Sequence, residues 1–276
     1  MFEMDLWMSM AYFIEQQVDY CIIEAGMGGR LDATTALDYQ ACLITNVGLD
    51  HTEYLGNTFE QIAYEKSGIF KPNVPALTTE DKPECQKVMK LVADYMNTPL
   101  CFIDCQETDV IRWNGMTFHL NPPLYQAKNL SLALETLNVL GIWLEENEIQ
   151  EVIDHFQWAG RFMVLRKAPL VLLDGAHNVH GITALIHALK NFHGKIYFSV
   201  LKEKDAPHMI ELLQTISKDI TLVEISSARL YPLEKLGYPI ITVDELISRL
   251  KDTKEGSLLC GSLYYVGEVL EKWGNV

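Results

Sequence analysis

Apolar residues in the first half of the chain follow two different periods. Helical spacing predicts helices over residues 3–16, 59–68, 81–96 and 127–144. Short runs rich in β-branched and aromatic residues predict buried strands at 20–23 and 41–45, with a weaker β-like stretch over about 100–120. A glycine-rich loop, residues 26–30, follows the first of these strands, and a polar loop, residues 46–58, follows the second.

The second half of the chain alternates more plainly between the two periods. Strands are predicted at 170–173, 195–200, 220–225, 240–243 and 257–260, and helices near 179–190, 206–217, 244–251 and 263–272. Such alternation is typical of a parallel sheet with helices on both faces and right-handed crossovers. We therefore expect an α/β protein with a domain boundary near residue 157. Its sites should lie at the carboxyl ends of the strands.

Composition indicates which partners and which cellular compartment the protein is expected to have. The 276 residues include 37 acidic and 22 basic side chains, a formal net charge of -15, which disfavours nucleic acid as a partner. No run of 18 apolar residues predicts a membrane span, and the N-terminus does not resemble a signal peptide. The six cysteines lack zinc-site spacing. Cys21, Cys42 and Cys260 fall in predicted strands, so we expect buried thiols and a cytoplasmic protein.

Two polar side chains stand out because each follows a predicted strand. Glu24 ends the first strand and His51 lies just beyond the second, so both are expected at the carboxyl edge of the sheet. A carboxylate and an imidazole at that edge could bind a divalent ion. An isolated Glu or His at a strand end more often has a structural role or is solvated, and the glycines after Glu24 are compatible with a tight turn. Spacing alone leaves both interpretations open.

Two long segments resemble a known family. Residues 24–34, Glu-Ala-Gly-Met-Gly-Gly-Arg-Leu-Asp-Ala-Thr, and residues 44–71, which include Asp50-His51 and Glu65-Lys66-Ser67-Gly68, are similar to the signatures of the folylpolyglutamate and dihydrofolate synthases, which are Mur-type amide ligases. The resemblance implies that Glu24 and His51 bind Mg²⁺. It also implies a catalytic role for Lys66, carbamylated so that its ammonium becomes an anionic oxygen ligand.

The resemblance extends to a nucleotide site. The Tyr-Gln-Ala-Lys-Asn sequence at 125–129 is similar to a His-Gln-x-x-Asn pattern, which implies that Asn129 reaches adenine and that Gln126 assists. Tyr125 departs from the usual histidine. The Trp-Ala-Gly-Arg sequence at 158–161 resembles a Pro-Gly-Arg junction, so Arg161 is expected on the ATP phosphates.

Residues 174–178, Asp-Gly-Ala-His-Asn, match the family pattern fully. The match implies that Asp174 holds the ribose and that the catalytic residue His177 lies near the γ-phosphate or the incoming glutamate. Weaker similarities occur at 201–205 and 261–268, where Ser262 also suits a helix N-cap.

The family's fold and activity follow as expectations. Residues 1–157 should form the remainder of a P-loop NTPase-like three-layer domain, and residues 158–276 a Rossmann-like glutamate-ligase domain. The expected enzyme is a monomer that uses ATP and Mg²⁺ to join L-glutamate to a folate carboxylate through an acyl phosphate. Dihydrofolate synthase activity on dihydropteroate, alone or in a bifunctional enzyme, is the first alternative.

One family motif is not found in the sequence. The Gly-Thr-x-Gly-Lys-Gly-Ser loop that cradles ATP phosphates does not occur, and the Gly-Lys pair at 194–195 has neither the preceding glycine nor a following Ser or Thr. We therefore expect a truncated version with an exposed strand edge and little activity from this chain alone. A non-catalytic fragment is the second alternative.

Overall fold

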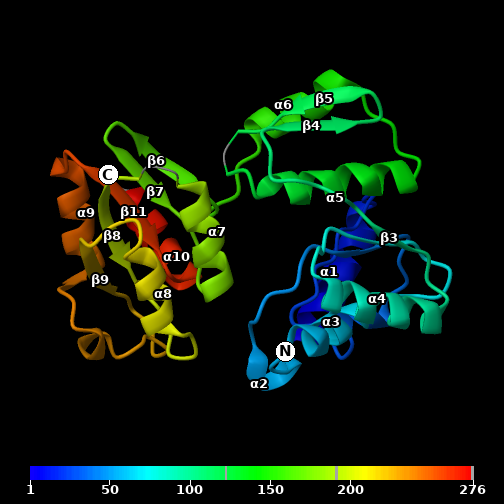
Figure 1. The fold of residues 1–276 in the computed structure, drawn as a ribbon, viewed down its shortest axis with the longest axis horizontal. Helices are drawn as coiled ribbons and strands as arrows, with labels where there is room; N and C mark the ends of the chain where they lie inside the picture. The colour runs from blue at the N-terminus through cyan, green and yellow to red at the C-terminus, as the bar shows by residue number, and fades with distance from the viewer. Residues whose placement is uncertain (122, 190–191, 275–276) are drawn as a thin grey trace. The chain divides into compact units, whose positions relative to one another are not determined.

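Two compact units make up the chain in the computed structural model, which describes residues 1–121, 123–189 and 192–274 (Figure 1). Unit 1 comprises Met1–Leu120 and Gln126–Gln150, and unit 2 comprises Asn121–Tyr125 and Glu151–Val276. The division of the chain at residue 157 into two functional domains stays a prediction. Each unit contains its own sheet and its own apolar core.

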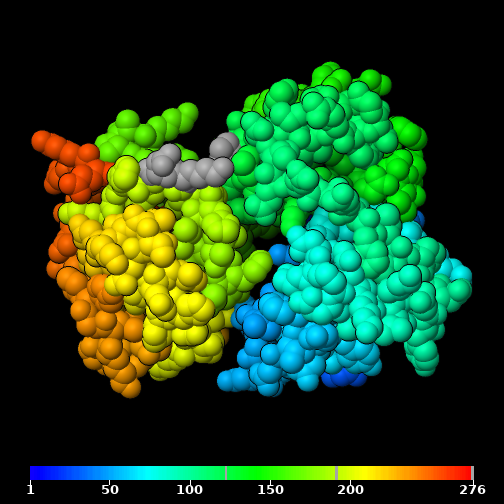
Figure 2. Space-filling view, in the orientation of Figure 1, coloured from blue at the N-terminus to red at the C-terminus, as the bar shows by residue number. Residues whose placement is uncertain are grey.

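Unit 1 is built on a three-stranded parallel sheet in the order β1-β2-β3. Its strands are β1 (Cys42–Ile44), β2 (Ala76–Thr78) and β3 (Leu100–Phe102). Helices α3 (Phe59–Ser67) and α4 (Pro83–Met96) bury their apolar sides against β1 and β2 in one cluster. Helix α4, cyan in Figure 2, presents its other side at the surface. Strand β2 (Ala-Leu-Thr) was not predicted, because it lacks the run of β-branched and aromatic residues by which the other short strands were identified.

The remaining elements of unit 1 are short or lie at its surface. They are α1 (Phe2–Gln16), the 3₁₀ helix η1 (Ala33–Ala36), α2 (Thr52–Leu55), the antiparallel hairpin β4 (Val110–Trp113) and β5 (Met116–His119), and α5 (Gln126–Val139). Helix α6 (Glu146–His155), whose first residues belong to unit 1, was not predicted. Helix α1 forms as predicted, yet none of its residues is buried.

The strand predicted at residues 20–23 is absent from the described chain, so that prediction was wrong. The side chains of Tyr20 and Ile22 are 62% and 94% exposed. A β-rich run becomes a strand only when a neighbouring strand accepts its hydrogen bonds, and this segment pairs with none in the described residues. Cys21 is consequently exposed, contrary to the expectation of a buried thiol, whereas Cys42 and Cys260 are buried as expected.

Unit 2 is a six-stranded sheet in the order β10-β9-β8-β11-β7-β6. Its strands are β6 (Met163–Lys167), β7 (Leu170–Leu173), β8 (Gly194–Phe198), β9 (Ile220–Glu224), β10 (Ile240–Thr242) and β11 (Gly256–Cys260). The predicted parallel pairing is confirmed for five strands. Strand β6, which was not predicted, is antiparallel to β7 at one edge.

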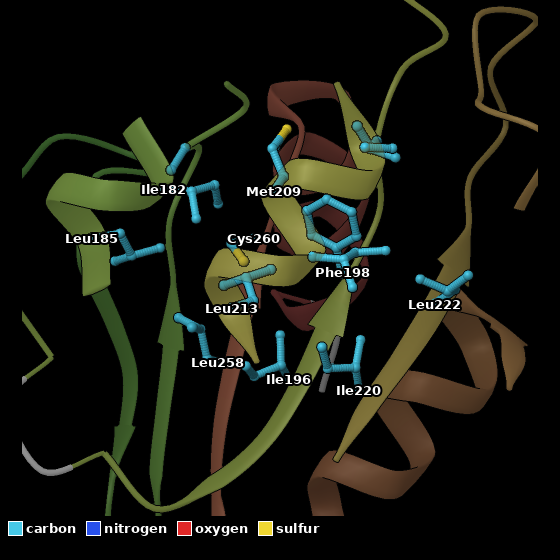
Figure 3. Packing of buried hydrophobic residues seen from close by; sticks show 14 of the residues in the cluster. Ile182, Leu185, Ile196, Phe198, Met209, Leu213, Ile220, Leu222, Leu258 and Cys260 are labelled. Carbon is cyan, nitrogen blue, oxygen red and sulfur yellow. The ribbon is translucent and has the colours of Figure 1, made fainter. Parts of the chain in front are cut away.

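Helices cover both faces of this sheet, as predicted. Helices α7 (Val179–Ala188) and α8 (Ala206–Leu213) pack on one face, and α9 (Val243–Asp252) and α10 (Leu263–Trp273) pack on the other; the short η2 (Leu233–Leu236) lies between β9 and β10. Figure 3 shows Ile182 and Leu185 of α7 beside Met209 and Leu213 of α8 over strand residues of the same cluster. Alternate strand residues serve the two faces: Leu258 joins the α7–α8 cluster and Leu259 the α9–α10 cluster.

The structure also bears on the helix predicted at 179–190 and on membrane-spanning segments. The helix predicted at 179–190 ends at Ala188, and Lys190 lies outside the described residues. No helix in the described part of the chain is both long and apolar enough to span a bilayer.

Candidate active site

The glycine-rich loop packs directly against the C-terminal end of α3. A Cβ on Gly29 would lie 2.8 Å from the carbonyl oxygen of Lys66 and 3.0 Å from that of Glu65, so only glycine allows this approach. The backbone N–H of Arg30 donates to the Glu65 carbonyl at 2.8 Å. These contacts bring the loop that follows Glu24 next to the helix end that carries Lys66.

Side chains reinforce the same contact. The guanidinium of Arg30 donates to both oxygens of the Glu65 carboxylate, with Nη2 to Oε1 at 2.9 Å and Nε to Oε2 at 3.2 Å, and it lies over the Tyr64 ring at 5.5 Å. Two parallel N–H···O bonds to one carboxylate fix orientation as well as distance. Within the loop, Asp32 accepts hydrogen bonds from the backbone of Met27 at 2.9 Å and of Thr34 at 3.0 Å. The loop is therefore held in one conformation from both of its ends.

Lys66 is half-buried in the last turn of α3 and faces acidic neighbours. Burial lowers the pKa of its ammonium, while the charges of Asp50 and Glu24 raise it and only partly offset this. A lowered pKa leaves more of the neutral amine, which is the form that reacts with carbon dioxide to give a carbamate. The structure thus brings Lys66 within electrostatic range of Glu24, as the proposed ligand set requires.

Asp50 is the residue that sequence reasoning missed. It lies next to His51 in the polar loop after β1, and its charge acts on Lys66. Asp50 Oδ1 accepts a hydrogen bond from the His51 backbone at 2.9 Å. The available signal was the pair of potential ligands at adjacent positions, of which only the histidine was considered.

His51 itself is exposed at the start of α2, with a left-handed φ of 49°. This conformation is uncommon for a residue other than glycine and turns the chain sharply after Asp50. Among the described residues there is no cluster of three or more His, Cys, Asp or Glu side chains in metal-binding arrangement. The assignment of Glu24, His51 and Lys66 to a metal accordingly stays a prediction, and it depends on an anionic Lys66.

Gly68 provides a direct test of the loop-to-helix contact. A Cβ at Gly68 would lie 2.2 Å from the Cα of Arg30, so we expect Gly68→Ala to push the glycine-rich loop away from α3 and to lower the free energy of unfolding by at least about 2 kcal/mol. Thermal and urea unfolding measure the change. Gly267→Ala is the control, because no atom lies within 4 Å of its added Cβ and alanine favours the helix. Equal stability of the two variants would contradict the contact.

In unit 2, Asp174 follows β7 and is almost fully buried, with 3% of the residue exposed. Its Oδ2 accepts from the backbone N–H of Phe162 at 2.7 Å, and its Oδ1 accepts from that of Ala176 at 2.7 Å. Burial raises the pKa of this carboxyl, and those two bonds, with the charges of Arg161 and His177, oppose the rise. Asp174 therefore joins the 160–162 segment to the end of β7, whether or not it also accepts a ribose hydroxyl.

The segment around Arg161 is closely packed on the turn after Asp174. Gly175 N–H donates to the Gly160 carbonyl at 2.6 Å, and a Cβ on Gly175 would lie 3.1 Å from the guanidinium Nη1 of Arg161. Burial raises the pKa of the nearby Tyr125 hydroxyl well above its usual value; the Asp174 charge adds to this, and the Arg161 charge opposes it. Tyr125, Arg161 and Asp174 thus lie together in unit 2.

The other predicted nucleotide residues have local partners. His177 Nδ1 lies 2.8 Å from the Gly175 carbonyl, and Asn178 caps α7 by accepting from Gly181 N–H at 2.7 Å. In unit 1, α5 begins at Gln126, whose Oε1 accepts from Asn129 Nδ2 at 2.8 Å. The N-cap role of Ser262 is confirmed, because its hydroxyl accepts from Tyr264 N–H at 3.2 Å. The nucleotide roles of Asn129, Gln126, Arg161, Asp174 and His177 stay predictions.

Comparison with known proteins identifies the family. Residues 2–130 match the model of the Mur ligase middle domain. The chain is 30% identical to a dihydrofolate synthase/folylpolyglutamate synthase of Bacillus subtilis, with 95% of the chain and 69% of that protein covered.

Solved structures agree with the sequence relatives. The bifunctional folylpolyglutamate synthase/dihydrofolate synthase of Yersinia pestis, complexed with AMPPNP and a manganese ion, matches with a TM-score of 0.87 at 25% identity, over 99% of this chain and 71% of that one. The Escherichia coli FolC in complex with DHPP and ADP matches with a TM-score of 0.81 at 27% identity, over 95% and 68% of the two chains. This chain therefore belongs to the folylpolyglutamate and dihydrofolate synthase family of Mur-type, ATP-dependent ligases.

Proposed function

We propose that this chain carries the central and C-terminal parts of an enzyme that joins L-glutamate to a folate carboxylate at the expense of ATP. The observation that carries the proposal is the placement of Lys66, half-buried beside the glycine-rich loop and within the field of Asp50 and Glu24. A phosphoryl-transfer site needs such anionic ligands for a divalent ion next to a rigid loop. Its products are the amide, ADP and phosphate.

The donor set suits magnesium if Lys66 is carbamylated. Glu24, Asp50 and a carbamate on Lys66 would supply the hard oxygen ligands that Mg²⁺ prefers, and His51 would add a nitrogen. The bound ion would neutralise charge on the transferring phosphoryl group. The protein's own part is to hold these donors on short loops and on the end of α3, which the bonds between Arg30 and Glu65 connect to the glycine-rich loop.

We assign nucleotide binding to two sets of residues. Asn129, with Gln126 beside it, suits the adenine edge because an amide both donates and accepts. Arg161 suits the phosphates because its planar fork matches phosphate oxygens. Asp174 holds the Arg161 segment and retains free lone pairs for the ribose, and His177 is assigned to the γ-phosphate or the incoming glutamate.

A second activity, dihydrofolate synthesis from dihydropteroate, is favoured by one observation. The Bacillus subtilis relative bears both activity names. Competing steady-state assays with dihydropteroate and with a reduced folate, each with L-glutamate and ATP, distinguish a single from a dual activity. We further propose a cytoplasmic monomer, consistent with the six free cysteines of the structure.

The metal assignment is tested by Glu24→Ala and His51→Ala in the longest native polypeptide that contains these residues. Each variant should lower Mg²⁺-dependent turnover by about 100-fold or more, because electrostatic stabilisation of the transferring group is lost, and should change folate binding by less than about threefold. Turnover against Mg²⁺ concentration and fluorescence titration with folate give the two numbers. His119→Ala, at an exposed position, is the control. Wild-type turnover of either variant at limiting Mg²⁺ would remove that residue from the ligand set.

A further inference from the structure

An ion pair between the buried Glu80 and the half-buried Lys82 contacts the loop that carries Asp50 and His51. Glu80 is buried, with only 2% of the residue exposed, and it lies just beyond the carboxyl end of β2. Its Oε1 accepts from the backbone N–H of Lys82 at 2.8 Å and from the Lys82 ammonium at 3.2 Å. Its Oε2 accepts from the backbone N–H of Val47. Neither family signature contains this pair.

The pair binds the polar loop through both the backbone N–H and the backbone carbonyl of Val47. Glu80 binds the Val47 N–H, and Lys82 Nζ donates to the Val47 carbonyl at 3.0 Å. Two residues earlier in that loop, the Thr45 carbonyl accepts from Thr79 Oγ1 at 2.7 Å. Three side chains of the β2–α4 connection therefore fix residues 45–47, which lead straight into Asp50 and His51.

The same pair also touches the helix that carries Lys66. The Lys82 ammonium lies 5.3 Å from the centre of the Phe59 ring, and Phe59 is the first residue of α3. Between the two residues of the pair in sequence, Asp81 Oδ2 accepts a hydrogen bond from Lys128 Nζ of α5 at 2.7 Å. The connection after β2 is thus joined to the Asp50 loop, the start of α3 and the start of α5.

We propose that Glu80 and Lys82 are positioning residues, whose bonds to Val47 set the place of Asp50 and His51 relative to Lys66. The inference rests on the proposed metal site and extends it to residues outside it. Stability is a weak reason for the pair, because desolvation of a buried carboxylate often leaves an ion pair no more stabilising than well-packed apolar side chains. What apolar side chains lack is directed hydrogen bonding to the Val47 backbone.

The test separates positioning from stability with matched variants of the 276-residue chain. Glu80→Gln leaves Lys82 without its counter-charge, and Glu80→Leu/Lys82→Met replaces both charges with apolar groups. Glu84→Leu/Lys87→Met, at a half-buried and an exposed position of α4, is the matched double control. Each is measured for melting temperature and for Mn²⁺ binding by electron paramagnetic resonance in bicarbonate buffer, with Glu24→Ala as the reference for a lost ligand.

We expect Glu80→Gln to lower both melting temperature and Mn²⁺ affinity, the latter at least tenfold. The Leu/Met double variant should regain most of the melting temperature but not the affinity, and the control should resemble wild type. Recovery of affinity together with stability would overturn the inference and leave Glu80 with a purely structural role. Unchanged Mn²⁺ binding in Glu24→Ala, or none by wild type, would instead remove the metal site proposed above.

If the double variant does not fold, hydrogen exchange in the single variant Glu80→Gln still tests the inference. In Glu80→Gln, the Val47 amide should exchange at least tenfold faster, while amides in the middle of α4 should keep their wild-type rates. Equal acceleration of both segments would show global destabilisation and overturn the positioning role. An unchanged Val47 rate would overturn it as well, because the loop would then be held without Glu80.

Discussion

Lys66→Ala will lower ligase turnover by about 100-fold or more, and small carboxylates will restore part of it. The size follows from losing a group that stabilises transferring charge, worth roughly 3–4 kcal/mol in comparable sites. If Lys66 carries a carbamate, the alanine variant leaves a gap beside Asp50 and Glu24 in which formate or acetate can supply the missing oxygen. Rescue stays partial because a free ion must be immobilised.

The experiment compares initial rates of glutamate-dependent ADP release with and without formate, acetate and methylamine. It uses the longest native polypeptide that contains these residues. Lys90→Ala, at an exposed position of α4, is the control and should keep the wild-type rate. Rescue by methylamine alone would show that Lys66 acts as a cation. An unchanged rate in Lys66→Ala would exclude any essential role.

Asp174→Asn is expected to destabilise unit 2 locally and to weaken the nucleotide binding that we propose for the Arg161 segment. Both carboxylate oxygens accept backbone N–H groups, from Phe162 and Ala176, so an amide nitrogen in place of either oxygen sets donor against donor. One buried N–H is then unsatisfied, at a cost of about 1–3 kcal/mol. Because Phe162 follows Arg161 directly, the KM for ATP should rise by roughly 10–100-fold, each tenfold corresponding to about 1.4 kcal/mol.

Unfolding curves and the KM for ATP are measured together for this variant. Asp252→Asn, at an exposed position near the end of α9, is the control for the loss of a negative charge. A lower stability with an unchanged KM would show that Asp174 supports the fold of unit 2 without influencing the nucleotide. No change in either quantity would contradict the two hydrogen bonds.

Local patterns predicted most of the regular elements. Strands β7, β8, β9 and β11 each contain a run of two or more apolar residues and are largely buried, as is typical of strands covered on both faces, and they form close to the predicted positions. Helices α3 and α9 carry their own start signals, capping boxes at Thr58 and Thr242. These signals lie within a few residues of the element that they specify, so they are local properties of the sequence.

Elements that depend on distant partners were less predictable. The run at 20–23 has the composition of a strand but finds no partner in the described residues, and α1 has the spacing of a helix yet buries nothing. Strand β6 forms because it can pair with β7 in antiparallel register at the edge of the sheet. Pairing is a property of two segments, and neither segment alone reveals it.

For the site, the sequence by itself determined the family and the candidate residues, such as Glu24, His51 and Lys66, with their order along the chain. Only the tertiary structure decided which side chains share an environment. It placed Asp50 within the field of Lys66, and it buried Glu80 where its carboxylate reaches Val47, 33 positions away in the chain. The reason is physical: burial and charge–charge interactions depend on distance in space, and folding sets that distance between segments that local sequence patterns describe only one at a time.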